Sequence, residues 1–168
     1  PADGSVHPAD VAESPSVRRE RQQRLVSALG SLLPSHALLW QNEDTVPYEC
    51  DGLSAYRERP LAVALPETEE QVAAVLKACR ELSVPVVARG AGTGLSGGAM
   101  PHREGLTLSL ARFNRILKID PRERVAIVQC GVRNLAISEA AAPHGLYYAP
   151  DPSSQIACTI GGKIGRAH

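Results

Sequence analysis

The sequence lacks the features that would place it in several functional classes. Its 168 residues contain no long apolar run, and only 4% of them are aromatic. Since a membrane-spanning helix needs about 20 consecutive apolar residues, none is predicted. The formal net charge is zero and Lys and Arg form no dense block, so nucleic acid is not expected as a partner. No charged segment precedes an apolar one near the start, so we expect no signal peptide and a cytoplasmic location.

The sequence also lacks a cysteine pattern that would hold a metal. Cys50, Cys79, Cys130 and Cys158 are widely separated, and none belongs to a Cys-x-x-Cys pair. None has a histidine at the spacing that zinc sites use. We therefore expect four reduced, partly buried thiols and no zinc or iron–sulfur ligation in this chain.

The first part of the chain divides into an arm and a helical lead-in. Residues 1–16 have no hydrophobic periodicity and predict a flexible arm. Residues 17–56 contain a predicted helix from Val17 to Gly30, followed by an irregular polar stretch. The helix also carries a group of arginines, for which a solvated face is favoured over a lid or docking surface. They are Arg18, Arg19, Arg21 and Arg24.

A strand, a helix and a second strand follow. The apolar run Leu61 to Leu65 predicts the first strand, and Thr68 with Gln71 forms a capping box that opens the helix. The β-branched run Val84 to Ala88 predicts a buried second strand. Short links between these elements indicate a βαβ unit with parallel strands and a right-handed crossover. Ligands of open α/β sheets bind beyond the carboxyl ends of such strands.

A glycine-rich loop leaves that carboxyl end. Glycine lets the backbone come close to a ligand, and successive N–H groups can converge on an anion such as a diphosphate. The Gly-x-Gly-x-x-Gly pattern of a Rossmann unit is present, but no helix follows it, because Leu106 to Leu110 alternates like a strand. No Gly-Lys-Ser/Thr closes the loop as in a P-loop. The alternative to a ligand-binding loop is a flexible glycine linker without a ligand. The candidate residues are Arg89, Gly90, Ala91, Gly92, Thr93, Gly94, Leu95, Ser96, Gly97 and Gly98.

An antiparallel hairpin is predicted after the loop. The runs 115–120 and 125–129 flank Asp120-Pro121-Arg122-Glu123, in which Pro121 presets a turn. The switch from parallel to antiparallel pairing makes the sheet mixed. Asn134 can then cap a helix that runs to Ala142. His144, after it, reads as a solvated residue rather than a catalyst.

A second glycine-bearing block lies at residues 150–162. Two prolines stiffen it, hydroxyl side chains follow, and Gly161 and Gly162 permit a close backbone approach. Together with the first loop, it would provide two walls for one long dinucleotide.

Four polar residues earlier in the chain could be taken for acid–base groups: Glu49, Asp51, Tyr56 and Arg57. Nothing near them would tune a pKa, so we interpret them as loop and capping residues.

Four separate stretches carry a family resemblance: 48–57, 89–98, 131–138 and 147–162. They resemble the vanillyl-alcohol oxidase, or PCMH-type, FAD-binding superfamily, and most closely the glycolate oxidase members of its D-2-hydroxyacid dehydrogenase branch. The resemblance implies an α+β fold in which residues 57–162 form an incomplete PCMH-type FAD-binding domain, with a βαβ unit and a mixed sheet that includes the antiparallel hairpin.

The resemblance also implies a cofactor and a reaction. The glycine loop would hold the FAD diphosphate, and the flavin side would be lined by Pro150, Asp151, Cys158, Thr159 and Gly162. No His or Cys occurs from Arg89 to Ala99, so the FAD would be bound non-covalently. The family oxidises 2-hydroxy acids such as glycolate or D-lactate by hydride transfer to FAD. Partner subunits with iron–sulfur clusters, and peripheral attachment to the inner membrane through them, are implied as well.

The resemblance stops after Gly162. Residues 163–168 depart from the family pattern and read as an atypical tail of a truncated chain. No residue is assigned a catalytic or a metal-binding role, because the substrate site of the family lies farther along the chain. The alternative interpretation is a catalytically inert flavin-domain fragment that only binds nucleotide or associates with other chains.

Overall fold

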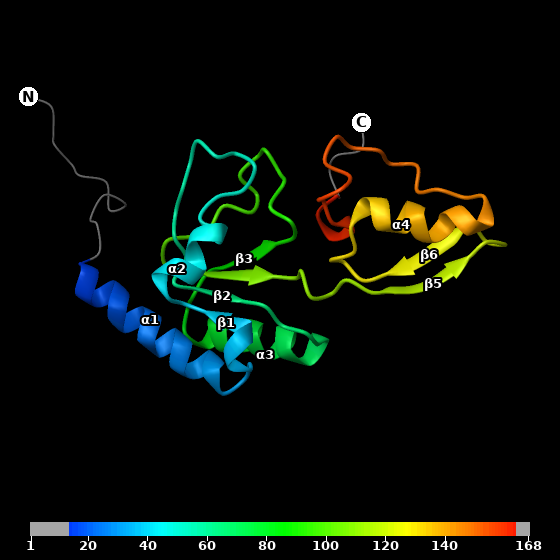
Figure 1. Ribbon diagram of the computed structural model, residues 1–168. Helices are drawn as coiled ribbons and strands as arrows, with labels where there is room; N and C mark the ends of the chain where they lie inside the picture. Colours follow the sequence, from blue (N-terminus) through cyan, green and yellow to red (C-terminus); the bar gives the residue numbers. More distant parts are fainter. Residues whose placement is uncertain (1–13, 164–168) are drawn as a thin grey trace, which may run out of the picture.

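A computed structural model describes residues 14–163. A four-stranded sheet with α1 (Pro15–Gly30) and α3 (Glu69–Glu81) packed against it forms one part of the molecule. A two-stranded hairpin covered by α4 (Asn134–Ala141) forms the other (Figure 1). No helix within residues 14–163 has both the length and the hydropathy to cross a bilayer.

The four-stranded sheet has the order β1-β2-β4-β3 and is mixed as predicted, but its antiparallel member is β1 and not the hairpin, which forms a separate sheet. β2 (Ala62–Ala64), β4 (Leu106–Ser109) and β3 (Val86–Arg89) run parallel, whereas the two-residue β1 (Leu38–Leu39) pairs antiparallel with β2. The predicted parallel orientation of β2 and β3 is confirmed. They are not neighbours, however, because β4 lies between them.

The position of β3 corrects one expectation. The run Val84 to Ala88 predicts a buried strand, but β3 lies at the edge of the sheet and its residues are only half-buried or exposed. β2 and β4 are fully buried instead. β-Branched composition indicates a strand but does not distinguish an edge strand from a central one.

Helix α1 begins two residues before the predicted Val17. Pro15 occupies the first helical turn, and the Ser14 side chain accepts a hydrogen bond from the Val17 N–H. Proline suits this position because its missing N–H would have no helical partner. Most of the arm predicted for residues 1–16 lies outside the described residues.

Two arginines of α1 are not part of a solvated face, contrary to expectation. Arg18 donates to the backbone carbonyls of Arg59 (3.1 Å), Pro60 (3.3 Å) and Arg103. Arg21 forms an ion pair with Glu104 at 2.5 Å. α1 is thus tied to the segments before β2 and before β4, both far away in sequence.

The core of this part draws on α1, α3 and the sheet together. Leu25 and Leu29 of α1 are fully buried in one cluster with Leu61, Val75 and Leu106. Helix α3 begins as predicted, because the Thr68 hydroxyl accepts from the Gln71 N–H at 3.2 Å. α1 is therefore an integral part of the fold rather than a lid.

The cysteines are free thiols in the described residues, and two of them, Cys79 and Cys158, are buried. Burial raises the pKa of the Cys79 thiol to about 11. No group of three potential metal-ligating side chains is found within residues 14–163.

The predicted hairpin is confirmed. β5 (Ile116–Asp120) pairs antiparallel with β6 (Val125–Val128), and the two form a sheet of their own. The Asp120 carboxylate accepts from the N–H groups of Arg122 and Glu123, each at 3.2 Å. The hydrogen bond from Lys118 contributes most to holding the pKa of Asp120 below its usual value, and the hydrogen bonds from these turn N–H groups add to the effect.

Helix α4 corrects another expectation. Arg133, not Asn134, is its N-cap residue, and no side chain caps the helix. Asn134 is fully buried inside the first turn and donates to the Pro150 carbonyl at 3.0 Å.

Short helical turns complete the described chain: α2 (Asn42–Thr45) and 3-10 turns at Ser35–Ala37, Val46–Tyr48, Ala142–His144 and Ile160–Gly162.

We expect Leu29→Ala to lower the free energy of unfolding by about 2–5 kcal/mol, because it removes a fully buried side chain from the shared core. Val17→Ala, on the same helix but 42% exposed, should change it by less than about 1 kcal/mol. Urea unfolding followed by circular dichroism measures both. Equal effects would show that α1 does not pack as described.

Candidate functional site

The candidate site lies where two neighbouring parallel strands end. Arg89 at the end of β3 pairs with Ser109 at the end of β4. The glycine loop and the connection from β4 to β5 therefore leave the same edge of the sheet. This edge faces the hairpin and α4 (Figure 1).

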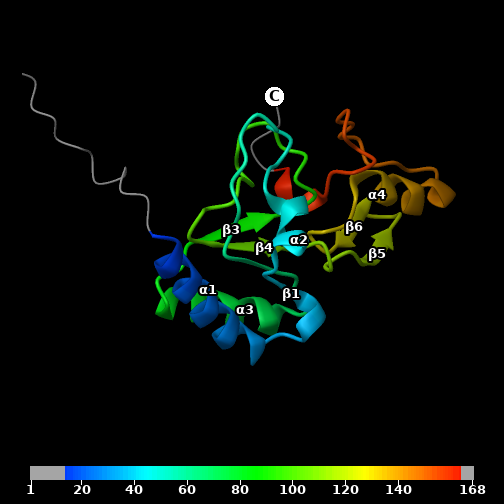
Figure 2. The same ribbon diagram turned by 60° about the vertical axis from the view of Figure 1, so that its left-hand side comes forward.

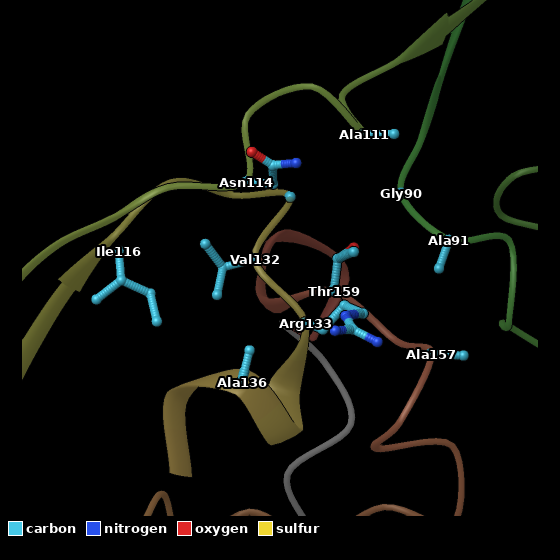
Figure 3. Close-up of a pocket in the computed structure, with 11 residues that line it drawn as sticks. Gly90, Ala91, Ala111, Asn114, Ile116, Val132, Arg133, Ala136, Ala157 and Thr159 are labelled. Atoms are coloured by element: carbon cyan, nitrogen blue, oxygen red, sulfur yellow. The ribbon is translucent and has the colours of Figure 1, made fainter. Parts of the chain in front are cut away.

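A cavity of about 390 Å³ lies at this edge, within the size range of small-molecule sites. Four stretches of chain contribute to it: the glycine loop, the β4–β5 connection with the start of β5, the entry to α4, and the second glycine-bearing block (Figure 3). The lining residues are Gly90, Ala91, Ala111, Asn114, Ile116, Gly131, Val132, Arg133, Ala136, Ala157 and Thr159.

The two blocks predicted to face each other do so. A Cβ atom on Gly90 would collide with the Thr159 hydroxyl oxygen, so any larger residue would push the two walls apart. Thr159 in turn forms an antiparallel bridge with Arg133. Gly90 at the start of the first loop and Thr159 of the second block are thus held at close contact across the cavity.

The second block is attached to the entry of α4 by backbone hydrogen bonds. Ile160 donates to the Val132 carbonyl (2.9 Å), Gly161 to Cys130 (2.8 Å), and Asn134 to Cys158 (2.9 Å). A tight turn precedes them, in which Ser154 accepts from Ala157 and Cys158. This wall of the cavity is therefore built by residues 130–135 as much as by the predicted block.

The backbone N–H groups of the glycine loop are available to donate hydrogen bonds to a ligand. Within residues 14–163, no backbone or side-chain atom accepts a hydrogen bond from the N–H groups of residues 90–98. Backbone N–H groups in folded proteins are nearly always paired with protein or solvent. A run of unpaired donors, with positive φ angles at Gly92 (+70°) and Gly97 (+73°), is suited to bind an anion.

The loop rests on residues 48–53, and Figure 2 shows the two segments side by side. A Cβ atom on Gly52 would lie 2.8 Å from the Gly94 carbonyl oxygen. Asp51, beside it, is buried and accepts from the Leu53 N–H at 2.9 Å. Glu49 pairs with Arg57 at 2.7 Å. Asp51, Glu49 and Arg57 thus make local contacts within this segment, although the second carboxylate oxygen of Asp51 has no hydrogen-bond partner among the described residues.

Arg89 also helps to hold the glycine loop against residues 48–53. Its guanidinium donates to the Cys50 carbonyl at 2.7 Å and lies 5.5 Å from the centre of the Tyr48 ring. It also packs under Gly92, where a Cβ atom would meet the guanidinium. The sequence suggests Arg89 as a cation for the diphosphate; the structure gives its side chain a partner within the chain.

The predicted site residues do not all meet at the cavity. Gly90, Ala91 and Thr159 line it, whereas the rest of the glycine loop extends away from it over residues 48–53. Cys158 is buried behind the wall, and Pro150, Asp151 and Gly162 are exposed outside the lining.

Sequence reasoning missed the contribution of the β4–β5 connection and of Arg133. A signal for Arg133 was available, since residues 131–138 are one of the stretches that carry the family resemblance. Ala111 and Asn114 follow a predicted strand, but nothing in their composition marks a site.

The chemistry of the lining favours binding over proton transfer. Alanines, Val132 and Ile116 provide apolar surface, and Thr159 and Asn114 provide hydrogen-bonding groups. Arg133 is the one ionisable side chain among the described lining residues. No carboxylate or imidazole lines the cavity in the described part of the chain, so it presents no general base there.

Comparison with known proteins identifies relatives across most of the chain. The family model described as "FAD binding domain" matches residues 60–167. The glycolate oxidase subunit GlcD of Escherichia coli strain K12 is 61% identical over 140 residues, which are 83% of this chain and 28% of that protein. A D-lactate dehydrogenase of Archaeoglobus fulgidus is 45% identical over 102 residues, or 61% of this chain and 23% of its own length.

A solved structure supports the fold. The chain superposes on 4-ethylphenol oxidase from Gulosibacter chungangensis with a TM-score of 0.75 and 22% identity, covering 92% of this chain and 29% of that one. The chain spans less than a third of the length of the curated relatives that it matches.

Proposed function

The chain belongs to the FAD binding domain family, and from this premise we propose that it is the FAD-binding part of a flavin-dependent 2-hydroxyacid oxidoreductase. One observation supports this most strongly: the N–H groups of residues 90–98, which have no acceptor among the described residues, begin at the rim of the cavity that Gly90 and Thr159 line. When bound, FAD supplies the chemistry, as acceptor of a hydride from the hydroxylated carbon.

The residues present fit such a cofactor. A diphosphate needs several N–H donors on a backbone that it can approach closely, and the glycine loop offers both. A flavin ring needs an apolar slot, which the alanines and Val132 offer. We place the diphosphate at residues 90–98 and the flavin against the second block, with Pro150, Asp151, Cys158, Thr159 and Gly162 near it.

Residues 57–162 form the cofactor-binding region in this proposal, with α1 as its structural support. The substrate is a small 2-hydroxy acid such as glycolate or D-lactate, in keeping with the names of the relatives. The Escherichia coli relative is named as a subunit, which supports assembly with other chains. Iron–sulfur partner subunits, and contact with the inner membrane through them, follow from the family resemblance.

Gly94→Ala should weaken FAD binding about tenfold or more, because a side chain hinders close approach of a phosphate to the backbone. A Cβ atom at Gly94 meets nothing within 4 Å, so folding should be unchanged. Gly30→Ala, equally open but at the end of α1, is the matched control. Quenching of flavin fluorescence on titration measures the affinities. Equal affinity in the two variants would refute the loop assignment.

The FAD should be released completely when the loaded protein is denatured with acid. No histidine or cysteine occurs from residue 89 to residue 99, so the glycine loop provides no attachment for a covalent bond to the flavin. The supernatant after precipitation should hold all the yellow colour. A coloured pellet would contradict non-covalent binding.

The FAD-loaded chain by itself should not be reduced by glycolate or D-lactate. The described cavity lining has no group that would accept the substrate's proton, so the visible flavin absorbance should persist and an electron-accepting dye should stay oxidised. The full-length Escherichia coli relative serves as the positive control. Bleaching by this chain alone would show that it holds a complete active site.

A further inference from the structure

Arg133 is placed to act on a ligand in the cavity. It lies at the entry to α4, and its side chain reaches toward Thr159 and Ala157 (Figure 3). It is the one cation among the lining residues of the described chain. No described residue forms a salt bridge or a side-chain hydrogen bond with its guanidinium.

The backbone of Arg133 is held firmly, although its side chain has no partner within residues 14–163. It bridges to Thr159, and the neighbouring Val132 carbonyl accepts from Ile160 at 2.9 Å. On the other side, Asn134 is fully buried and hydrogen-bonded to Cys158 and Pro150. The guanidinium therefore extends from a fixed point on the cavity wall, and binding a ligand would order only the exposed side chain of Arg133.

Arg89 and Arg133 differ in how their charge is used. Arg89 packs under the loop, with its guanidinium on the Cys50 carbonyl and the Tyr48 ring. Arg133 faces the cavity from the opposite wall, across from Gly90 and Ala91, where the glycine loop begins. An anion held by the loop N–H groups at this end would come within reach of Arg133 and not of a second cation in the lining.

We propose that Arg133 is the residue that binds a phosphate of the cofactor from the wall opposite the glycine loop. The proposal rests on the proposed FAD-binding function. A guanidinium is suited to this task because its N–H donors match two phosphate oxygens at once. The loop would then supply neutral donors on one side of the phosphate, and Arg133 the charge on the other.

Arg133→Gln should weaken FAD binding at least about tenfold, since a charge-assisted hydrogen bond is lost. Arg133→Lys should retain part of the affinity, because it keeps the charge but not the planar fork. Arg122→Gln, which removes an exposed arginine from the hairpin turn, is the matched control and should leave the affinity unchanged. Fluorescence titration of the whole chain with FAD measures all four proteins.

The dependence on salt separates an electrostatic role from a structural one. Between about 0.05 M and about 0.5 M NaCl, the wild-type affinity should fall more steeply than that of Arg133→Gln, because salt screens the ion pair. Thermal unfolding without FAD should be the same in both proteins. An unchanged FAD affinity in Arg133→Gln, an equal salt dependence, or a lower unfolding temperature would each overturn the role of Arg133. If the wild-type chain itself fails to bind FAD, the proposed function is refuted, and the inference with it.

Discussion

The in-register parallel pairing of β3 with β4 is the constraint on which the site depends. It places Arg89 opposite Ser109, so two connections that are distant in sequence leave one edge of the sheet together. The first is the glycine loop and the second leads into the hairpin. A shift of one residue in this register would turn every side chain of the edge strand to the opposite face. It would also separate Gly90 from Thr159, which meet across the cavity.

The two walls of the cavity are built in different ways. The glycine loop has little internal hydrogen bonding and is supported from outside, by Arg89 on the Cys50 carbonyl and by the close contact of Gly52 with Gly94. The opposite wall is a network of backbone hydrogen bonds between residues 130–135 and the second block. One wall thus leaves its donors available to a ligand, whereas the other uses its own for rigidity. This division suits a site in which the loop N–H groups face an anion and the opposite, rigid wall presents the Arg133 charge together with apolar surface.

The described cavity is suited to binding a ligand rather than to transferring a proton. The described cavity has one cation, a few hydrogen-bonding groups and apolar surface, but no proton acceptor. Flavin enzymes tolerate such a division because the cofactor carries the redox chemistry and the protein supplies orientation and charge. The relatives are more than three times as long as the part that this chain matches, which leaves room in them for a substrate site elsewhere.

Local features were predictable from the sequence, and long-range ones were not. The Thr68 cap, the hairpin turn at Asp120 and the glycine loop could all be inferred, because each depends on a few adjacent residues. The strand order, the edge position of β3 and the contacts of Arg18 with distant carbonyls depend on which segments meet in space. The same holds for the two arginines of the site. Composition marks both Arg89 and Arg133 as cations, but only the packing around them decides which one supports the loop and which one faces the cavity.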